Sequence, residues 1–231
     1  RLAERGYAVT MFEQDAHPGG QYGGHHDAQG RFHEHSLHLF LNWYRNFWRL
    51  AGELGVGDRF EPRSTLRFLR RGEFPRTRYL TNVGAPDAWT KNLASGVIPA
   101  PDMWLYGYSL LDLISEPLDR GKFLGNVSVN GFMRSRPYAT DRAAEQHNRT
   151  LSKAFSSFSY NTSASSYRRY IGNGFRSPDP MMWALRGNCH DEFIAPFAAR
   201  LESLGVRIET LSPVKRPVSY THLRAHETLL D

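Results

Sequence analysis

The sequence predicts an α/β protein whose two ends share one pattern and whose middle is largely helical. Residues 1–20 have the order helix, glycine, short strand and acid. Residues 193–209 repeat the order helix, glycine and strand. The region between them carries apolar and aromatic residues at helical spacing, with one segment of alternating pattern. We therefore expect one α/β unit, interrupted by a largely helical insertion.

The opening of the chain has the pattern of the second half of a βαβ unit. Residues 2–5 are good helix formers, Gly6 suits the left-handed position after a helix, and residues 7–12 are rich in strand formers. Glu13 follows the strand, at the position where an acid accepts hydrogen bonds from a ribose in dinucleotide-binding units. The first strand and Gly-rich loop of such a unit would precede Arg1. The same order also occurs in α/β folds that bind no nucleotide.

A glycine pair narrows this interpretation. Pro18-Gly19-Gly20 begins five residues beyond Glu13, and the arrangement resembles the FAD-dependent amine oxidase and phytoene desaturase superfamily. The resemblance implies a partial Rossmann-like FAD-binding domain, with its first strand and Gly-rich loop missing, and an inserted, largely helical α+β substrate domain. In that family the two glycines let the backbone approach FAD, and a basic residue follows them. Gln21 stands in that place here and carries no charge.

The next segment extends the resemblance. Glu34-His-Ser-Leu-His38, followed by aromatic residues, is similar to relatives that act on squalene-like or carotene-like lipids, such as carotenoid desaturases and hydroxysqualene dehydroxylase-like flavoproteins. In those proteins the backbone passes close to the flavin here, which implies that Ser36 and His38 lie near FAD. Ser36 stands where the family prefers glycine. From the residues alone, His35 and His38 are equally well explained as ordinary loop or strand-edge residues.

Six histidines fall between His17 and His38. Imidazole is a common metal ligand, but this spacing matches no zinc signature and no cysteine is near. We therefore predict no metal site. Residues 21–30, which are rich in glycine and polar residues, are expected to form a loop.

The middle of the chain predicts helices and one hairpin. The main expectations are a helix capped by Asn42 and stopped by Gly55, a hairpin turning at Gly72-Glu73, helices over 103–118 and 142–158, and a loop-rich stretch over 167–183. Aromatic residues lie beside arginines in the last of these segments. Core packing is the first interpretation, and lining an apolar substrate tunnel or stacking on bases are the alternatives.

The segment 188–216 predicts a return to the first domain. A helix capped by Asp191 and ended by Gly205 leads into a strand that starts at Val206. In the superfamily such a helix returns the chain to the FAD-binding domain, and a valine that follows contacts the adenine through its backbone. Val214 matches that position.

The last residues do not look like part of the fold. Val218–Thr228 corresponds to the translation of DNA that resembles a transposase adapter from sequencing libraries. We therefore expect this chain to be an internal piece of a longer gene. The expected division is 1–41 for the first part of the FAD-binding domain, 42–187 for the inserted substrate domain, 188–216 for the return to the FAD-binding domain, and 217–231 for a non-native tail.

Composition limits the remaining possibilities. The net charge of +6 is spread along the chain, so we expect no nucleic-acid partner. The single cysteine, Cys189, excludes an intrachain disulfide and favours a reducing, cytoplasmic location. No stretch approaches the roughly 20 apolar residues that span a bilayer.

The resemblance implies an oxidoreductase that passes hydride or electrons from an apolar, isoprenoid-type substrate to FAD, with peripheral membrane contact. It names no acid, base or nucleophile. The residues it assigns to the cofactor are Glu13, Gly19, Gly20, Gln21, Ser36, His38 and Val214. An amine oxidase for a small amine, and a non-enzymatic Rossmann-type nucleotide-binding or scaffold protein, are the alternatives. We expect the chain as given to hold FAD poorly and to be inactive.

Overall fold

The computed structural model describes residues 1–69, 72, 77–81, 87–116, 121–177 and 180–215. The chain forms two compact units. The first unit comprises Arg1–Leu39, Asn46–Glu61 and the described residues from Leu185 onward. The helical unit comprises Phe40–Arg45 and Pro62–Ala184. The tail predicted at 217–231 lies outside the described residues.

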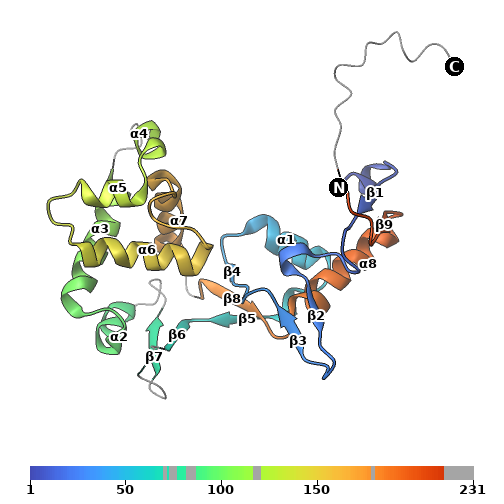
Figure 1. The fold of residues 1–231 in the computed structure, drawn as a ribbon, viewed down its shortest axis with the longest axis horizontal. Coiled ribbons are helices and arrows are strands. Elements are labelled where there is room, and N and C mark those ends of the chain that lie inside the picture. Colours follow the sequence, from blue (N-terminus) through green and yellow to red (C-terminus); the bar gives the residue numbers. More distant parts are fainter. Residues whose placement is uncertain (70–71, 73–76, 82–86, 117–120, 178–179, 216–231) are drawn as a thin grey trace, which may run out of the picture. The chain divides into compact units, whose positions relative to one another are not determined.

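The first unit is built on two parallel strands from opposite ends of the sequence (Figure 1). Strand β1 (Thr10–Phe12) pairs with β9 (Arg207–Glu209), so that Thr10 lies opposite Arg207. A short 3-10 helix, η1 (Ala3–Arg5), precedes β1, and α8 (Ala195–Ser203) precedes β9. The predicted order of helix, glycine and strand is thus confirmed at both ends.

Two details of this unit differ from the prediction. The strand begins at Thr10 rather than Tyr7, and all three of its residues are exposed. A strand inside a βαβ unit is normally buried, but in the described part of the chain β9 is the one strand that pairs with β1. At the other end, Asp191 is not the helix cap. Its backbone N–H donates to Asn188 Oδ1 over 2.7 Å, and the π-helix η5 (His190–Ile194) begins just before it.

A small hairpin follows the glycine pair. Strands β2 (Gly24–His26) and β3 (Phe32–Glu34) pair antiparallel, so the expected loop over 21–30 is partly strand. The turn is held by Asp27, whose Oδ1 accepts the backbone N–H groups of Gln29 and Arg31, each over 2.9 Å.

Helix α1 (Arg45–Glu53) starts two residues later than a cap at Asn42 predicts and ends before Gly55, as predicted. Asn42 does not cap it. Its backbone N–H donates to the Met181 carbonyl over 2.9 Å, and its side-chain amide donates to the Pro180 carbonyl over 3.3 Å. The sequence could not indicate these partners because they lie far along the chain.

Aromatic contacts explain why α1 belongs to the first unit. The ring of Phe47 lies 5.5 Å from that of Phe60 and 5.2 Å from that of Phe193, and Trp48 lies 5.1 Å from Phe60. Phe60, in β5 (Phe60–Arg63), follows the 3-10 helix η3 (Gly57–Arg59). These contacts place residues 46–61 with the first unit, whereas we expected them in the insertion. The functional division into FAD-binding and substrate domains stays a prediction.

The helical unit contains the expected hairpin. Strands β6 (Thr65–Leu69) and β7 (Thr77–Thr81) pair antiparallel. Gly72 has a φ of +84°, as a turn requires, and Glu73 lies outside the described residues. Helix α2 (Ala88–Ser95) is tied to this hairpin by Asn92, which accepts the Thr81 N–H over 2.6 Å and donates to the Thr81 carbonyl over 2.9 Å.

Helices form the body of this unit, and they lie against one another in Figure 1. They are α3 (Ala100–Ser115), α4 (Gly121–Asn126), α5 (Val129–Arg134), α6 (Asp141–Phe155) and α7 (Ala164–Arg176). The helices predicted over 103–118 and 142–158 are confirmed with shifted ends. Side chains of Ser128, Thr140 and Ser163 cap the last three helices. The core includes Leu113, Leu124, Phe132, Leu151 and Tyr167.

The loop-rich stretch expected over 167–183 is wrong. Helix α7 continues to Arg176, and Met182–Leu185 forms strand β8. Gly174 favoured a loop in the prediction because glycine is a poor helix former, but it is buried inside α7. Strand β4 (Phe40–Leu41) pairs antiparallel with β8, in a sheet of order β4, β8, β5.

Candidate functional site

Glu13 lies directly after β1 and faces the segment that follows β9. Its backbone N–H donates to the Glu209 carbonyl over 2.8 Å, and its carbonyl accepts the Ser212 N–H over 2.7 Å. One carboxylate oxygen accepts the Asp15 N–H over 3.0 Å. Within the described residues the other oxygen makes no hydrogen bond, so it can accept a hydroxyl from a ligand.

Gly19 and Gly20 both have a positive φ, but the space around them differs. Gly19 has a φ of +141°, and a Cβ there would lie 3.1 Å from the backbone of Gly23 and 3.3 Å from Ile194 Cγ2. Any side chain would therefore clash within the turn. Gly20 has a φ of +53°, and a Cβ there would meet no atom within 4 Å. Its backbone faces open space, which a ligand can approach closely.

The glycine turn and the Ser36 to His38 segment are brought together. The short 3-10 helix η2 (Gly20–Tyr22) follows the turn, and the Tyr22 ring stacks on His38 at 4.4 Å between centroids. Gln21 and Ser36 are both exposed, and the Ser36 hydroxyl lies 3.2 Å from His35 Nδ1. Their predicted roles toward a cofactor stay predictions.

Val214 lies in the segment that follows β9. Strand β9 ends at Glu209, and Val214 lies beyond it in irregular backbone with its side chain 64% exposed. The connection to Glu13 at Ser212 nevertheless keeps this segment close to the end of β1. A backbone contact with a ligand stays a prediction.

One neighbour of this region was missed by sequence reasoning. His190, at the start of η5, contacts His17 at 5.3 Å between ring centroids, and Phe32 at 6.3 Å. The preceding N–H, of Cys189, donates to a Glu34 carboxylate oxygen over 2.5 Å. These contacts join segments that are far apart in sequence, and no local motif indicates them.

The described residues fit a bound dinucleotide in three respects. The Glu13 carboxylate has acceptor capacity, and the Gly20 backbone faces open space. The buried Nε2 of His38 has no hydrogen-bond partner in the part of the chain that the structure describes. A buried polar atom without a partner is costly, so a ligand group that pairs with it would be favoured.

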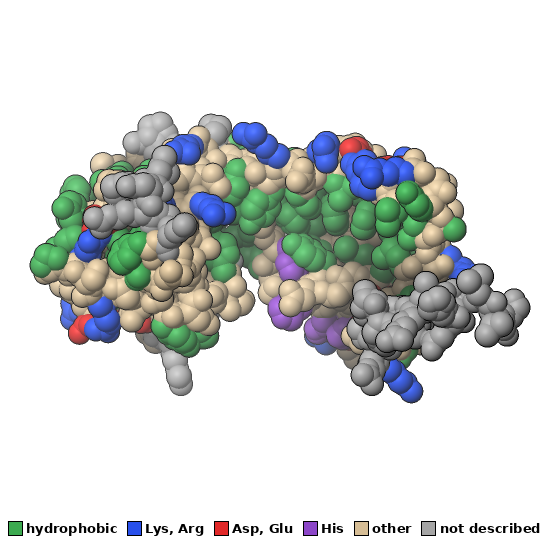
Figure 2. Space-filling model, turned by 90° about the horizontal axis from the view of Figure 1, so that it is seen from above, with side chains coloured by type: hydrophobic (Ala, Val, Ile, Leu, Met, Phe, Trp, Pro, Cys, Tyr) green, Lys and Arg blue, Asp and Glu red, His purple; other side chains and the backbone are tan. Residues whose placement is uncertain are grey.

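Several histidine side chains lie near one another on the face shown in Figure 2. His33 Nε2 lies 2.9 Å from Asp27, and this hydrogen bond is the largest cause that lowers the pKa of Asp27 to about 2. His25 stacks on His33 at 5.4 Å. No group of three or more possible metal ligands occurs among the described residues.

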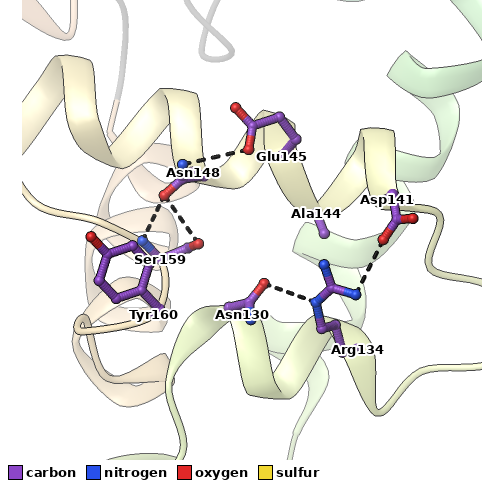
Figure 3. Close-up of a pocket in the computed structure, with 8 residues that line it drawn as sticks. All are labelled: Asn130, Arg134, Asp141, Ala144, Glu145, Asn148, Ser159 and Tyr160. Carbon is purple, nitrogen blue, oxygen red and sulfur yellow. Dashed lines mark hydrogen bonds and ion pairs between the residues drawn. The ribbon is translucent and has the colours of Figure 1, made fainter.

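A polar pocket of about 150 Å³ lies on the helical unit (Figure 3). Its polar groups bind one another: Arg134 pairs with Asp141 over 3.1 Å, and Asn148 accepts the Ser159 N–H over 3.0 Å. The Asn148 amide also lies 3.5 Å from Glu145. These bonds hold α5, α6 and the following loop together, so the pocket has a structural role.

A buried polar chain in the same unit has the residue types of a catalytic pair. Ser109 Oγ lies 2.7 Å from His147 Nε2, and His147 Nδ1 lies 3.1 Å from the Tyr167 hydroxyl. Ser109 gives its one proton to the Tyr106 carbonyl over 2.7 Å, so Nε2–H of His147 donates to Ser109. The Tyr167 hydroxyl then donates to Nδ1.

This chain is structural rather than catalytic. Ser109 is 1% exposed and His147 is 0% exposed, so no substrate reaches them. Burial lowers the pKa of His147 to about 3, which keeps the ring neutral. The interpretation of Tyr167 as a core residue is confirmed, since it is 1% exposed within the helical core.

Comparison with known proteins agrees with the class that this fold and site define. A family model described as an NAD(P)-binding Rossmann-like domain matches residues 1–54, a span that includes β1, the glycine pair and α1. The N-terminal part of this mixed α/β chain is thus similar to a Rossmann-like nucleotide-binding domain.

Individual relatives narrow the class. The chain is 24% identical over 228 residues to the 15-cis-phytoene desaturases of Solanum lycopersicum and Capsicum annuum, which covers 93% of the chain and 38% of each relative. A 15-cis-phytoene desaturase of an Oncidium hybrid cultivar is 37% identical over 60 residues, 26% of the chain and 10% of the relative. These findings support assignment to the superfamily of FAD-dependent amine oxidases and desaturases.

The chain spans 38% of the length of each of these two desaturases. None of the helices in the described residues is long and apolar enough to cross a membrane.

Proposed function

We propose that the intact protein is an FAD-dependent oxidoreductase that takes hydride or electrons from an apolar, isoprenoid-type substrate. The observation that carries the proposal is the placement of Glu13 and the Gly19-Gly20 turn after a parallel strand. This placement occurs in a chain similar to 15-cis-phytoene desaturases. We propose that this protein shares the kind of activity that the name of those relatives describes.

In this proposal the first unit holds the cofactor. The Glu13 carboxylate accepts hydrogen bonds from the adenosine ribose, and Gly19 and Gly20 allow the backbone to approach FAD. Gln21 offers an amide where a charge would be expected, and the backbone of Val214 meets the adenine. FAD, when bound, supplies the acceptor for hydride.

The remaining roles belong to orientation and shielding. Ser36 and His38 lie beside the flavin, and the His38 Nε2 finds there the partner that it lacks within the described residues. The proposal assigns no residue of this chain as an acid, base or nucleophile toward the substrate. The protein works by positioning an apolar substrate and excluding water. Peripheral membrane contact and a cytoplasmic location are part of the proposal.

The test uses protein expressed from the complete gene. We expect a visible flavin spectrum, and we expect Glu13→Gln to weaken FAD binding about tenfold through loss of a charge-assisted hydrogen bond. Glu202→Gln, which makes the same charge change on exposed α8, is the control and should bind FAD normally. Absence of flavin absorbance after addition of FAD would favour a scaffold protein.

The substrate is tested separately. Reduction of the bound flavin by an isoprenoid hydrocarbon under anaerobic conditions supports the proposal, and reduction by a small amine alone would favour an amine oxidase. The 231-residue chain by itself is expected to hold FAD poorly. Tight FAD binding by this chain would contradict that expectation.

A further inference from the structure

A second pocket in the helical unit has a different character from the polar one. It measures about 200 Å³ and lies between α6, the loop after it, and α7. Its apolar walls are the side chains of Leu151 and Phe155 from α6, and of Tyr167 and Tyr170 from α7. No charged side chain lines it. A charged ligand would therefore lose its hydration without finding a partner.

The three serine and threonine hydroxyl groups of the lining are each hydrogen-bonded within the protein. Ser157 Oγ lies 2.8 Å from Thr162 Oγ1, which donates to the Phe158 carbonyl over 2.9 Å. The Ser166 hydroxyl accepts from Ser163 over 2.9 Å. Because these groups bond to their own loop and helix, they offer little to a polar ligand, and the pocket favours hydrocarbon.

The walls are held in place before any ligand arrives. Tyr167 is fixed by its hydrogen bond to His147 Nδ1, which directs its hydroxyl to the buried chain with Ser109. Tyr170 packs edge to face on Phe155 at 4.6 Å between centroids. A preformed apolar pocket binds without a large ordering cost.

We propose that this pocket binds a neutral hydrocarbon group of about six to ten carbons, the size of one or two isoprene units. An apolar cavity of roughly 150 Å³ holds benzene, and this pocket is somewhat larger. All the residues that line the pocket belong to the helical unit, so hydrocarbon binding there needs no FAD. The site can therefore exist whether or not the proposed flavin chemistry does.

The test measures binding of limonene, a neutral C10 hydrocarbon, to the flavin-free protein by saturation-transfer NMR. Limonene should bind saturably, and 4-isopropylbenzoate, which has a similar shape but a charge, should bind at least about tenfold more weakly. Equal binding of the two probes, or limonene binding that does not saturate, would overturn the proposal.

Two variants locate the site. Ser166→Phe fills the pocket and should weaken limonene binding about tenfold or more. Asn173→Phe adds the same ring at an exposed position of α7 and should leave binding unchanged. Unchanged affinity in folded Ser166→Phe would refute the location.

Should Ser166→Phe fail to fold, as judged by circular dichroism, Phe155→Ala replaces it. This variant removes one wall at a side chain that is 40% exposed, so it is expected to fold. A loss of limonene affinity of about fivefold or more supports the site, and unchanged affinity overturns it. FAD titration of the same preparations tests the proposed flavin function separately, because neither limonene result depends on whether FAD binds.

Discussion

Lowering the pH from 7 to 5 is expected to destabilise the helical unit through His147. This side chain is 0% exposed, and burial lowers its pKa from 6.5 to about 3. Between these values the unfolded chain binds a proton that the folded chain does not. Stability is therefore complete above pH 6.5 and is lost as the pH falls toward 3.

The expected loss follows from the size of the shift. Each pH unit below 6.5 costs about 1.4 kcal/mol, so the free energy of unfolding at pH 5 is about 2 kcal/mol lower than at pH 7. Urea unfolding followed by far-ultraviolet circular dichroism at pH 7, 6 and 5 measures this change, because the helical unit carries most of the helices. The pH range stays above the titration of ordinary carboxylates.

A variant isolates the contribution of this one residue. His147→Gln should be less stable at pH 7, since it disturbs the bonds to Ser109 and Tyr167, but it should lose about 2 kcal/mol less between pH 7 and 5. His25→Gln changes an exposed histidine of the first unit and should keep the parental slope. Equal pH slopes in the parent and in His147→Gln would refute the reasoning.

Three further predictions concern the first unit. Gly19→Ala should cost about 2–3 kcal/mol, from its positive φ and the backbone atoms 3.1 Å from the new Cβ, whereas Gly30→Ala, which has a positive φ but open space, should cost about 1 kcal/mol. Urea unfolding followed by tryptophan fluorescence compares the two, and equal costs would contradict the steric argument. Cys189 is 3% exposed and burial raises its pKa to about 12, so a thiol reagent at pH 8 should label it only after unfolding; rapid labelling of native protein would show otherwise. Phe60→Ala should cost about 3–5 kcal/mol, because Phe60 is 3% exposed and packs on Phe47; a loss below about 1 kcal/mol in urea unfolding would disprove its core role.

Local patterns predicted those elements whose stability is local. The order of helix, glycine and strand was recognisable at both ends because Gly6 and Gly205 adopt left-handed backbone, with φ of +85° and +79°. The hairpin of β6 and β7 was recognisable because its residues alternate in type.

The predictions that were wrong concern residues whose contacts lie outside their own stretch of sequence. Asn42 has the residue type of a helix cap, but its amide bonds to Pro180, 138 residues away. Glycine is frequent in loops, yet Gly174 is buried inside α7, beside Met181. Neither partner can be read from a sequence window.

Some residues of the candidate site could be recognised from a local motif, and others could not. Glu13, Gly19 and Gly20 form a local motif, and the structure gives each a geometric reason. The contacts of His190 and Ile194 with this region come from a segment close to the other end of the chain, so only the fold reveals them.

The pairing of β1 with β9 also sets an order of assembly during synthesis. Thr10 and Arg207 are separated by 197 residues, so the first strand leaves the ribosome long before its partner is made. The helical unit lies between them, and its contacts are closer in sequence. This unit can fold before β9 is made. Until then, β1 lacks the strand that it pairs with in the described residues, and its unpaired edge is open to aggregation.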